Sequence, residues 1–182
     1  MEDLSLHILD IAENSRNAGA RTIEIRIRED RLQDVLTIDI TDDGEGMDAA
    51  TVAQVADPFY TTRTTRRVGL GLPMLAEASR AAGGTMDVRS TPGKGTIVSA
   101  TFRLGHIDRK PLGNMAETIT TLIAGWPDVD LTYRHDRDGG SVSFNTAEVR
   151  LRLGEEPLNS VEILNFILRY LAQEEDSLPH FG

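Results

Sequence analysis

The sequence predicts an α/β protein whose sheet has one face in water. Some segments alternate apolar and polar residues with a period of two, and others repeat apolar residues every three or four positions. In residues 22–28, isoleucines alternate with charged residues, as in an antiparallel strand with one wet face. The pattern changes near Gly105, so we place a boundary there between a first domain, residues 1–105, and a small α+β domain, residues 106–182.

The composition is that of an ordinary folded chain, and it excludes several functions. The 182 residues carry a formal net charge of −10, which argues against nonspecific binding to nucleic acid or anionic lipid. The absence of cysteine excludes disulfides and thiolate metal sites. We read no signal peptide and no membrane span, because the N-terminal segment M-E-D-L-S lacks basic residues and a long apolar run. A cytoplasmic protein is therefore expected.

The first domain alternates between expected helices and strands. The expected helices are residues 3–18, 49–55 and 73–82, and the expected strands are residues 22–28, 35–40, 85–89 and 96–104. Between two of the helices, residues 57–67 form a loop rich in Thr and Arg that follows no regular period. Pro73 fits only the first turn of a helix, which places that helix N-terminus directly at the glycines of V-G-L-G-L, residues 68–72.

The second domain shows the same two kinds of pattern. Its expected helices are residues 112–124 and 160–173, and its expected strands are residues 129–135, 141–145 and 149–153. The last helix has an apolar face that we interpret as core, with a partner-binding groove as the alternative. This face consists of Val161, Leu164, Ile167, Leu168 and Leu171.

Two glycine turns and one helix carry the residues suited to chemistry. Asp42 ends an alternating strand and is followed by Gly44 and Gly46, which lack a Cβ and let a ligand or another element come close. The second glycine turn leads into a helix N-terminus, where free N–H groups and the helix dipole favour an anion. Arg63 and the neighbouring Arg66 and Arg67 would add positive charge for a phosphate, with solvated loop residues as the competing interpretation of Arg66 and Arg67.

The helix expected over residues 3–18 supplies the remaining groups. Asp10 and Asn14 are four positions apart and therefore project from the same face. An Asn oxygen is a hard, neutral ligand that suits Mg²⁺, and a carboxylate one turn away could orient or deprotonate a nucleophile. Together with the two glycine turns, these groups indicate a nucleoside-triphosphate site.

Five segments then occur in a recognisable order and spacing: E-N-S-R-N-A-G-A, D-D-G-E-G-M, D-P-F-Y-T-T-R, V-G-L-G-L and P-G-K-G-T. Over roughly residues 3–104 the chain resembles the GHKL (Bergerat-fold) ATPases, most of all the ATP-binding domain of histidine kinases. The resemblance implies a two-layer α/β sandwich, with helices on one face of a mixed sheet, that binds ATP and Mg²⁺.

The resemblance also implies roles for single residues. Asn14 would be the Mg²⁺ ligand, Asp42 would accept the adenine amine, and Thr96 would support the base through a water. Further positions would contact the nucleotide, around the base, in a mobile lid or at the phosphates: Asn17, Gly44, Gly46, Met47, Phe59, Thr61, Thr62, Gly69, Leu70, Gly71 and Leu72.

Two candidate catalytic residues depart from the family pattern. Asp10, the candidate base, stands where hydrolysing members have a Glu and is one methylene shorter. Arg63 stands where the lid usually has a Lys, which keeps the charge but changes the geometry. His106 begins a segment similar to the phosphoacceptor box of histidine kinases, but Ile107 replaces the acid of that box, so a domain-linker residue is the competing interpretation.

These observations predict a stand-alone histidine kinase-like protein that binds Mg-ATP and transfers the γ-phosphate to a protein partner in signalling. The alternatives are an ATP-gated binding module or slow ATPase, and a serine kinase of the anti-sigma-factor kind. The expected partners are ATP and a phosphoacceptor or regulated protein, without nucleic acid, and a homodimer is possible.

Overall fold

The computed structural model describes residues 3–56 and 71–180, which form one six-stranded mixed sheet covered by helices. The strands are β1 (Thr22–Asp30), β2 (Val35–Asp42), β3 (Met86–Thr91), β4 (Gly95–Arg103), β5 (Asp130–Arg137) and β6 (Gly140–Asn145). The helices are α1 (Leu4–Asn17), α2 (Ala49–Ala56), α3 (Gly71–Ala81), α4 (Met115–Gly125), α5 (Thr146–Leu153) and α6 (Val161–Ser177).

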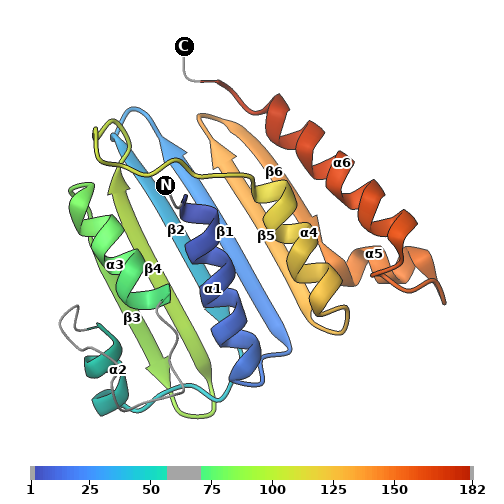
Figure 1. Cartoon of the computed structure of the whole chain (residues 1–182), viewed down its shortest axis with the longest axis horizontal. Coiled ribbons are helices and arrows are strands. Elements are labelled where there is room, and N and C mark those ends of the chain that lie inside the picture. Colours follow the sequence, from blue (N-terminus) through green and yellow to red (C-terminus); the bar gives the residue numbers. More distant parts are fainter. Residues whose placement is uncertain (1–2, 57–70, 181–182) are drawn as a thin grey trace.

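The strand order is β3-β4-β2-β1-β5-β6, and every neighbouring pair is antiparallel except β1 and β5, which are parallel. Helices α1, α3, α4 and α6 lie over the same face of this sheet (Figure 1). The expected two-layer sandwich, with helices on one face of a mixed sheet, is therefore confirmed.

The alternation of residue types explains which face of the sheet is covered. In β1, Ile23, Ile25 and Ile27 are buried beneath the helices, whereas Arg26 and Arg28 project from the opposite face and are exposed. Burial of one such isoleucine contributes about 1.5–3 kcal/mol, so the register of the sheet is strongly specified.

The segment after residue 105 completes the same sheet. Strand β5 pairs with β1, placing Leu131 opposite Ile23, and the buried side chains of α4, β5 and α6 belong to the same core cluster as those of α1. The segment that connects β4 to α4 is fixed to the start of α1. There, the N–H groups of Leu4 and Ser5 donate to the carbonyls of Pro111 and Leu112 at 2.9 and 2.8 Å. The division into two domains at residue 105 stays a prediction, and the two parts share one sheet and one core.

One expected strand is wrong. Residues 149–153 belong to helix α5, although V-R-L-R-L alternates as a strand would. The side-chain oxygen of Asn145 caps this helix by accepting from the N–H groups of Ala147 and Glu148, at 2.8 and 3.4 Å. Arg150 then fixes the helix to the sheet by donating to the carbonyl of Pro127 at 2.6 Å. A five-residue alternation is too short to outweigh a capped helix start.

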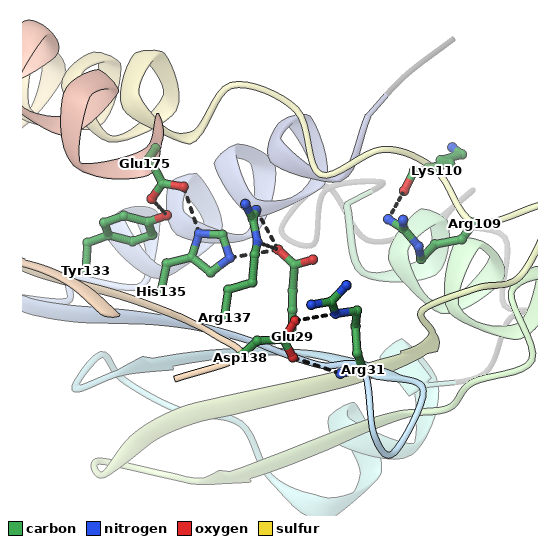
Figure 2. Close-up of polar contacts among 9 residues, drawn as sticks. All are labelled: Glu29, Arg31, Arg109, Lys110, Tyr133, His135, Arg137, Asp138 and Glu175. Carbon is green, nitrogen blue, oxygen red and sulfur yellow. Dashed lines mark hydrogen bonds and ion pairs between the residues drawn. The ribbon is translucent and has the colours of Figure 1, made fainter. Parts of the chain in front are cut away.

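A buried polar network joins α6 to the sheet (Figure 2). The ring of His135 on β5 lies between two carboxylates, with Nδ1 2.8 Å from Glu175 on α6 and Nε2 2.9 Å from Glu29 on β1. Tyr133 donates to the other oxygen of Glu175 at 2.6 Å, and Arg137 donates to Glu29 at 2.8 Å. Burial alone would lower the pKa of His135, but the hydrogen bonds to Glu175 and Glu29 raise it. The protonated ring can donate to both acids at once.

Candidate functional site

A cavity of about 480 Å³ opens at one end of the sheet. Its walls are formed by α1, the end of β2 and the turn that follows, α2, the first turn of α3, the β3–β4 turn and the start of β4. Its apolar walls, which suit a planar base, include Ile11, Val55 and Val98. Six of the predicted nucleotide-binding residues line it: Asn14, Asp42, Gly46, Met47, Leu72 and Thr96.

Asp42 is held in a fixed orientation at this cavity. One carboxylate oxygen accepts from the Ser15 hydroxyl at 2.6 Å, and the other accepts from the N–H of Gly44 at 2.9 Å. An ionised carboxylate has about four acceptor positions, so Asp42 keeps capacity for a donor on a ligand. The Ser15 contact joins residues 27 positions apart, and sequence reasoning missed it.

Thr96 faces Asp42 across the pairing of β2 with β4. Its hydroxyl lies 2.9 Å from that of Ser90, which also donates to the carbonyl of Gly95 at 2.9 Å and accepts from the N–H of Met47 at 2.8 Å. Ser90 thus ties the glycine turn to the β3–β4 turn, a role for which the sequence offered no signal.

Close packing within the protein explains why the turn after Asp42 contains glycines. Gly46 has φ +69°, and a Cβ there would lie 2.1 Å from the carbonyl oxygen of Thr91. A Cβ at Gly44 would lie 2.9 Å from the carbonyl oxygen of Ala18. Close packing against the β3–β4 turn and the end of α1 therefore already requires glycine, and the predicted room for a base stays a prediction.

Asp43, which the sequence left without a role, holds the turn in place. Its carboxylate accepts from the N–H groups of Arg21 and Thr22, each at 2.8 Å. Burial opposes the charge, but these backbone hydrogen bonds lower the pKa of Asp43 below its ordinary value.

Asn14 provides the clearest sign of a ligand. It lines the cavity, and its Nδ2 atom is buried without a hydrogen-bond partner among residues 3–56 and 71–180. A buried donor left unpaired costs about 1–3 kcal/mol, so a partner is expected to come from a bound molecule. The described residues contain no cluster of three or more His, Asp or Glu that could hold a metal alone. The Oδ1 atom of the same amide is a neutral oxygen of the kind that Mg²⁺ accepts, whereas the Nδ2 donor needs an acceptor such as a phosphate oxygen.

Asp10 and Asn17 differ from Asn14 in that both are exposed and neither lines the cavity. Asp10 instead touches the start of α3, where a Cβ added at Gly71 would lie 2.8 Å from its Cβ. Glycine at this position lets the N-terminus of α3 approach α1. Helix α3 begins at Gly71, two residues before the predicted start, and Leu72 and Pro73 line the cavity.

Several predicted site residues lie outside the described residues. These are the lid and phosphate positions Phe59, Thr61, Thr62, Arg63, Gly69 and Leu70, together with Arg66 and Arg67. Their roles stay predictions.

His106 follows the far end of β4. Thr96, at the cavity, and Arg103 are seven residues apart on that strand, a span of about 23 Å at about 3.3 Å per residue. The His106 ring accepts from the N–H of Asp108 at 3.1 Å and is partly exposed. One chain therefore does not bring this ring to its own cavity.

A mixed sheet with helices on one face, and a cavity that joins Asn14 on α1 to Asp42 at the end of β2, define an ATP-binding fold of the GHKL class. Residues 2–106 match the family model described as "Histidine kinase-, DNA gyrase B-, and HSP90-like ATPase". The match covers more than half of the chain, which therefore belongs to this family and contains its ATP-binding domain.

Among curated proteins, the chain is similar to the "Non-motile and phage-resistance protein" of Caulobacter vibrioides, with 34% identity over 51% of this chain and 12% of that protein. It is similar to "Sensor protein kinase FleS" of Pseudomonas aeruginosa, with 36% identity over 60% of this chain and 27% of that protein. A further relative is an "Anti-sigma F factor" of Caldanaerobacter subterraneus, with 34% identity over 45% of this chain and 54% of that protein.

The chain thus spans less than a third of the first two relatives. A solved N-terminal domain of a DNA repair protein gives a TM-score of 0.49 at 17% identity, covering 80% of this chain and 52% of that one. Within the described residues, no helix combines the length and apolar character needed to cross a membrane.

Proposed function

We propose that this chain binds Mg-ATP and transfers the γ-phosphoryl group to a histidine on another protein molecule. The observation that carries the nucleotide assignment is the pairing of two groups in one cavity. Asp42 is oriented by Ser15 and Gly44, and Asn14 keeps a buried donor without a partner in the described chain. Asp42 would accept a hydrogen bond from the exocyclic amine of adenine. Asn14 would bind the metal ion through Oδ1 and donate to a phosphate oxygen through Nδ2.

Transfer of a phosphoryl group depends mainly on positioning and on neutralising charge. The bound Mg²⁺ supplies charge neutralisation at the phosphate oxygens. The chain supplies the Asn14 amide, the backbone N–H groups at the start of α3, and Arg63, whose role is proposed from the sequence. The lone pair of the neutral acceptor imidazole forms a P–N bond with the γ-phosphorus as the P–O bond breaks, ADP leaves with that electron pair, and the N–H proton of the ring passes to solvent.

Two considerations favour an acceptor on another molecule. The similarity to a sensor protein kinase supports a protein acceptor. The position of His106 beyond the far end of β4, about 23 Å along the strand from Thr96, argues against transfer within one chain.

A second candidate is an ATP-gated binding module without rapid turnover. It is favoured by the exposure of Asp10 and its position outside the cavity, because a general base must reach the water that it activates. Similarity to an anti-sigma F factor keeps a third candidate, a serine kinase, in the same test.

Labelled phosphate distinguishes these functions. The purified chain is incubated with Mg²⁺ and ATP labelled at the γ-phosphate, with and without an extract of the cells that encode it. Acid-labile label on a protein, lost with the Asn14→Ala variant, is expected for the histidine kinase. Acid-stable label would identify a serine kinase, and free phosphate alone a slow ATPase. ATP binding without turnover would support the ATP-gated binding module. Failure to bind ATP would refute the nucleotide assignment.

A further inference from the structure

Helix α6 has an exposed face that the fold leaves uncovered. It packs against α4 and β6 through Ile167 and Leu171, which are 1% and 0% exposed. It lies at the outer margin of the helical layer (Figure 1). On its opposite side, steps of four, three and four residues align Glu162, Phe166, Arg169 and Gln173, all of them exposed.

The exposed face of α6 also carries large apolar side chains. Val161, expected from the sequence to lie in the core, is instead 72% exposed. Phe166 is 62% exposed, and its ring stacks on that of Tyr170 with centroids 6.4 Å apart. Tyr170 in turn contacts Phe144 on β6, so the exposed aromatic pair is fixed to the sheet rather than free to rotate. An exposed apolar group that is held in place suits a binding surface.

The charges on the same face lack partners of opposite sign. Neither Glu162 nor Arg169 forms an ion pair with any residue in 3–56 or 71–180, and Arg169 donates to the carbonyl of Asn165 on its own helix at 3.3 Å. They are seven positions apart, about 10 Å along the helix axis, too far to pair with each other.

This face is complementary to a reversed copy of itself. A two-fold axis between residues 165 and 166 would place Glu162 opposite the partner's Arg169, and Arg169 opposite the partner's Glu162. The same axis passes beside Phe166, so the Phe166 side chains of the two copies would meet near it. At 100° per residue, Glu162, Phe166 and Arg169 lie within about 60° of one another on the exposed face, so all three can face a partner helix at once.

We propose that α6 is a homodimer interface in which two copies of this chain pack antiparallel, with two Glu162–Arg169 ion pairs around an apolar centre. The occupant is a second copy because the order of charges matches its own reversal. Two chains of net charge −10 repel each other at long range, so contact between copies needs locally opposite charges, which this face supplies.

The interface is separate from the nucleotide cavity. Helix α6 lies over the β6 end of the sheet, whereas the cavity involves β2, β4, α1 and α3. Dimerisation can therefore be tested without disturbing ATP binding, and failure of one proposal does not imply failure of the other.

Charge reversal tests this interface by sedimentation equilibrium. The 20.0 kDa chain is expected to give a species of twice that mass at concentrations up to about 100 μM. Glu162→Arg and Arg169→Glu each place like charges together twice in the dimer, so each should weaken the dimer at least about tenfold. The double variant Glu162→Arg/Arg169→Glu restores both pairs in reverse and should recover the dimer.

Arg28→Glu is the matched control, because Arg28 is exposed on the uncovered face of β1. Circular dichroism and the affinity for an ATP analogue should be the same in all variants, which would show that they are folded. A monomer at every concentration would overturn the proposal. So would equal dimerisation of the single variants and the control, or a folded double variant that stays monomeric.

Discussion

Replacement of Asp42 by Asn tests the adenine assignment with little change in shape. In the native chain, both carboxylate oxygens accept hydrogen bonds, from Ser15 at 2.6 Å and from Gly44 at 2.9 Å. The Asn oxygen can keep the Gly44 contact, and its NH₂ group can donate to the Ser15 hydroxyl. The side chain should therefore keep its place, whereas an acceptor near the base becomes a donor.

The size of the effect follows from the bond that is lost. A hydrogen bond to a charged group contributes about 1.5–3 kcal/mol, so the affinity for ATP should fall about 10- to 150-fold. Guanine presents a carbonyl oxygen where adenine presents its amine, and the new NH₂ group can donate to that oxygen. The ratio of the ATP affinity to the GTP affinity should therefore fall by a larger factor than the ATP affinity itself.

Calorimetric titration with non-hydrolysable ATP and GTP analogues measures both affinities. Asp39→Asn is the control, because Asp39 also accepts from a serine hydroxyl at 2.6 Å, that of Ser99, and lies outside the cavity. ATP and GTP affinities in Asp42→Asn that match those of the control would refute the assignment of the base to this carboxylate.

Three further predictions concern Asn14, Asp10 and the buried histidine. Asn14→Ala should abolish Mg²⁺-dependent ATP binding, measured by titration with and without EDTA, and should not lower the melting temperature, since it removes a buried donor that has no partner within the described chain. Asp10→Asn should leave ATP affinity unchanged, because Asp10 lies outside the cavity, and an unchanged rate of phosphate release would remove it as a base. The raised pKa of His135 means that its charged ring stabilises the fold fully below the unfolded value of about 6.5, and this contribution is lost as the pH rises through the folded pKa. Urea unfolding should therefore show a fall in stability as the pH rises above about 6.5, which Glu175→Gln reduces and His180→Gln, at an exposed position, leaves unchanged.

The sequence was sufficient to predict the class of the fold and the nature of the ligand site. Alternating isoleucines predicted β1 and the helix-covered face of the sheet, because burial of one face fixes both period and register. Five glycine- and polar-rich segments predicted the family, and Asn14, Asp42 and Thr96 line one cavity as that resemblance implied.

Other features depended on contacts between distant residues. The alternation of residues 149–153 predicted a strand, but a cap at Asn145 and the contacts of Arg150 make it a helix. The parallel pairing of β5 with β1 joins both parts of the chain in one sheet, and no local pattern specifies which strand a later segment will meet.

What the sequence by itself determined was the local chemistry: which residues favour strand, helix or turn, and which side chains carry groups suited to a nucleotide. Only the tertiary structure decided how those side chains are held. It brought Ser15 to Asp42, gave Asp43 a role in the turn, and buried the Asn14 amide without a partner in the described chain. These contacts join segments far apart in sequence, and packing of α1 against the sheet brings them together.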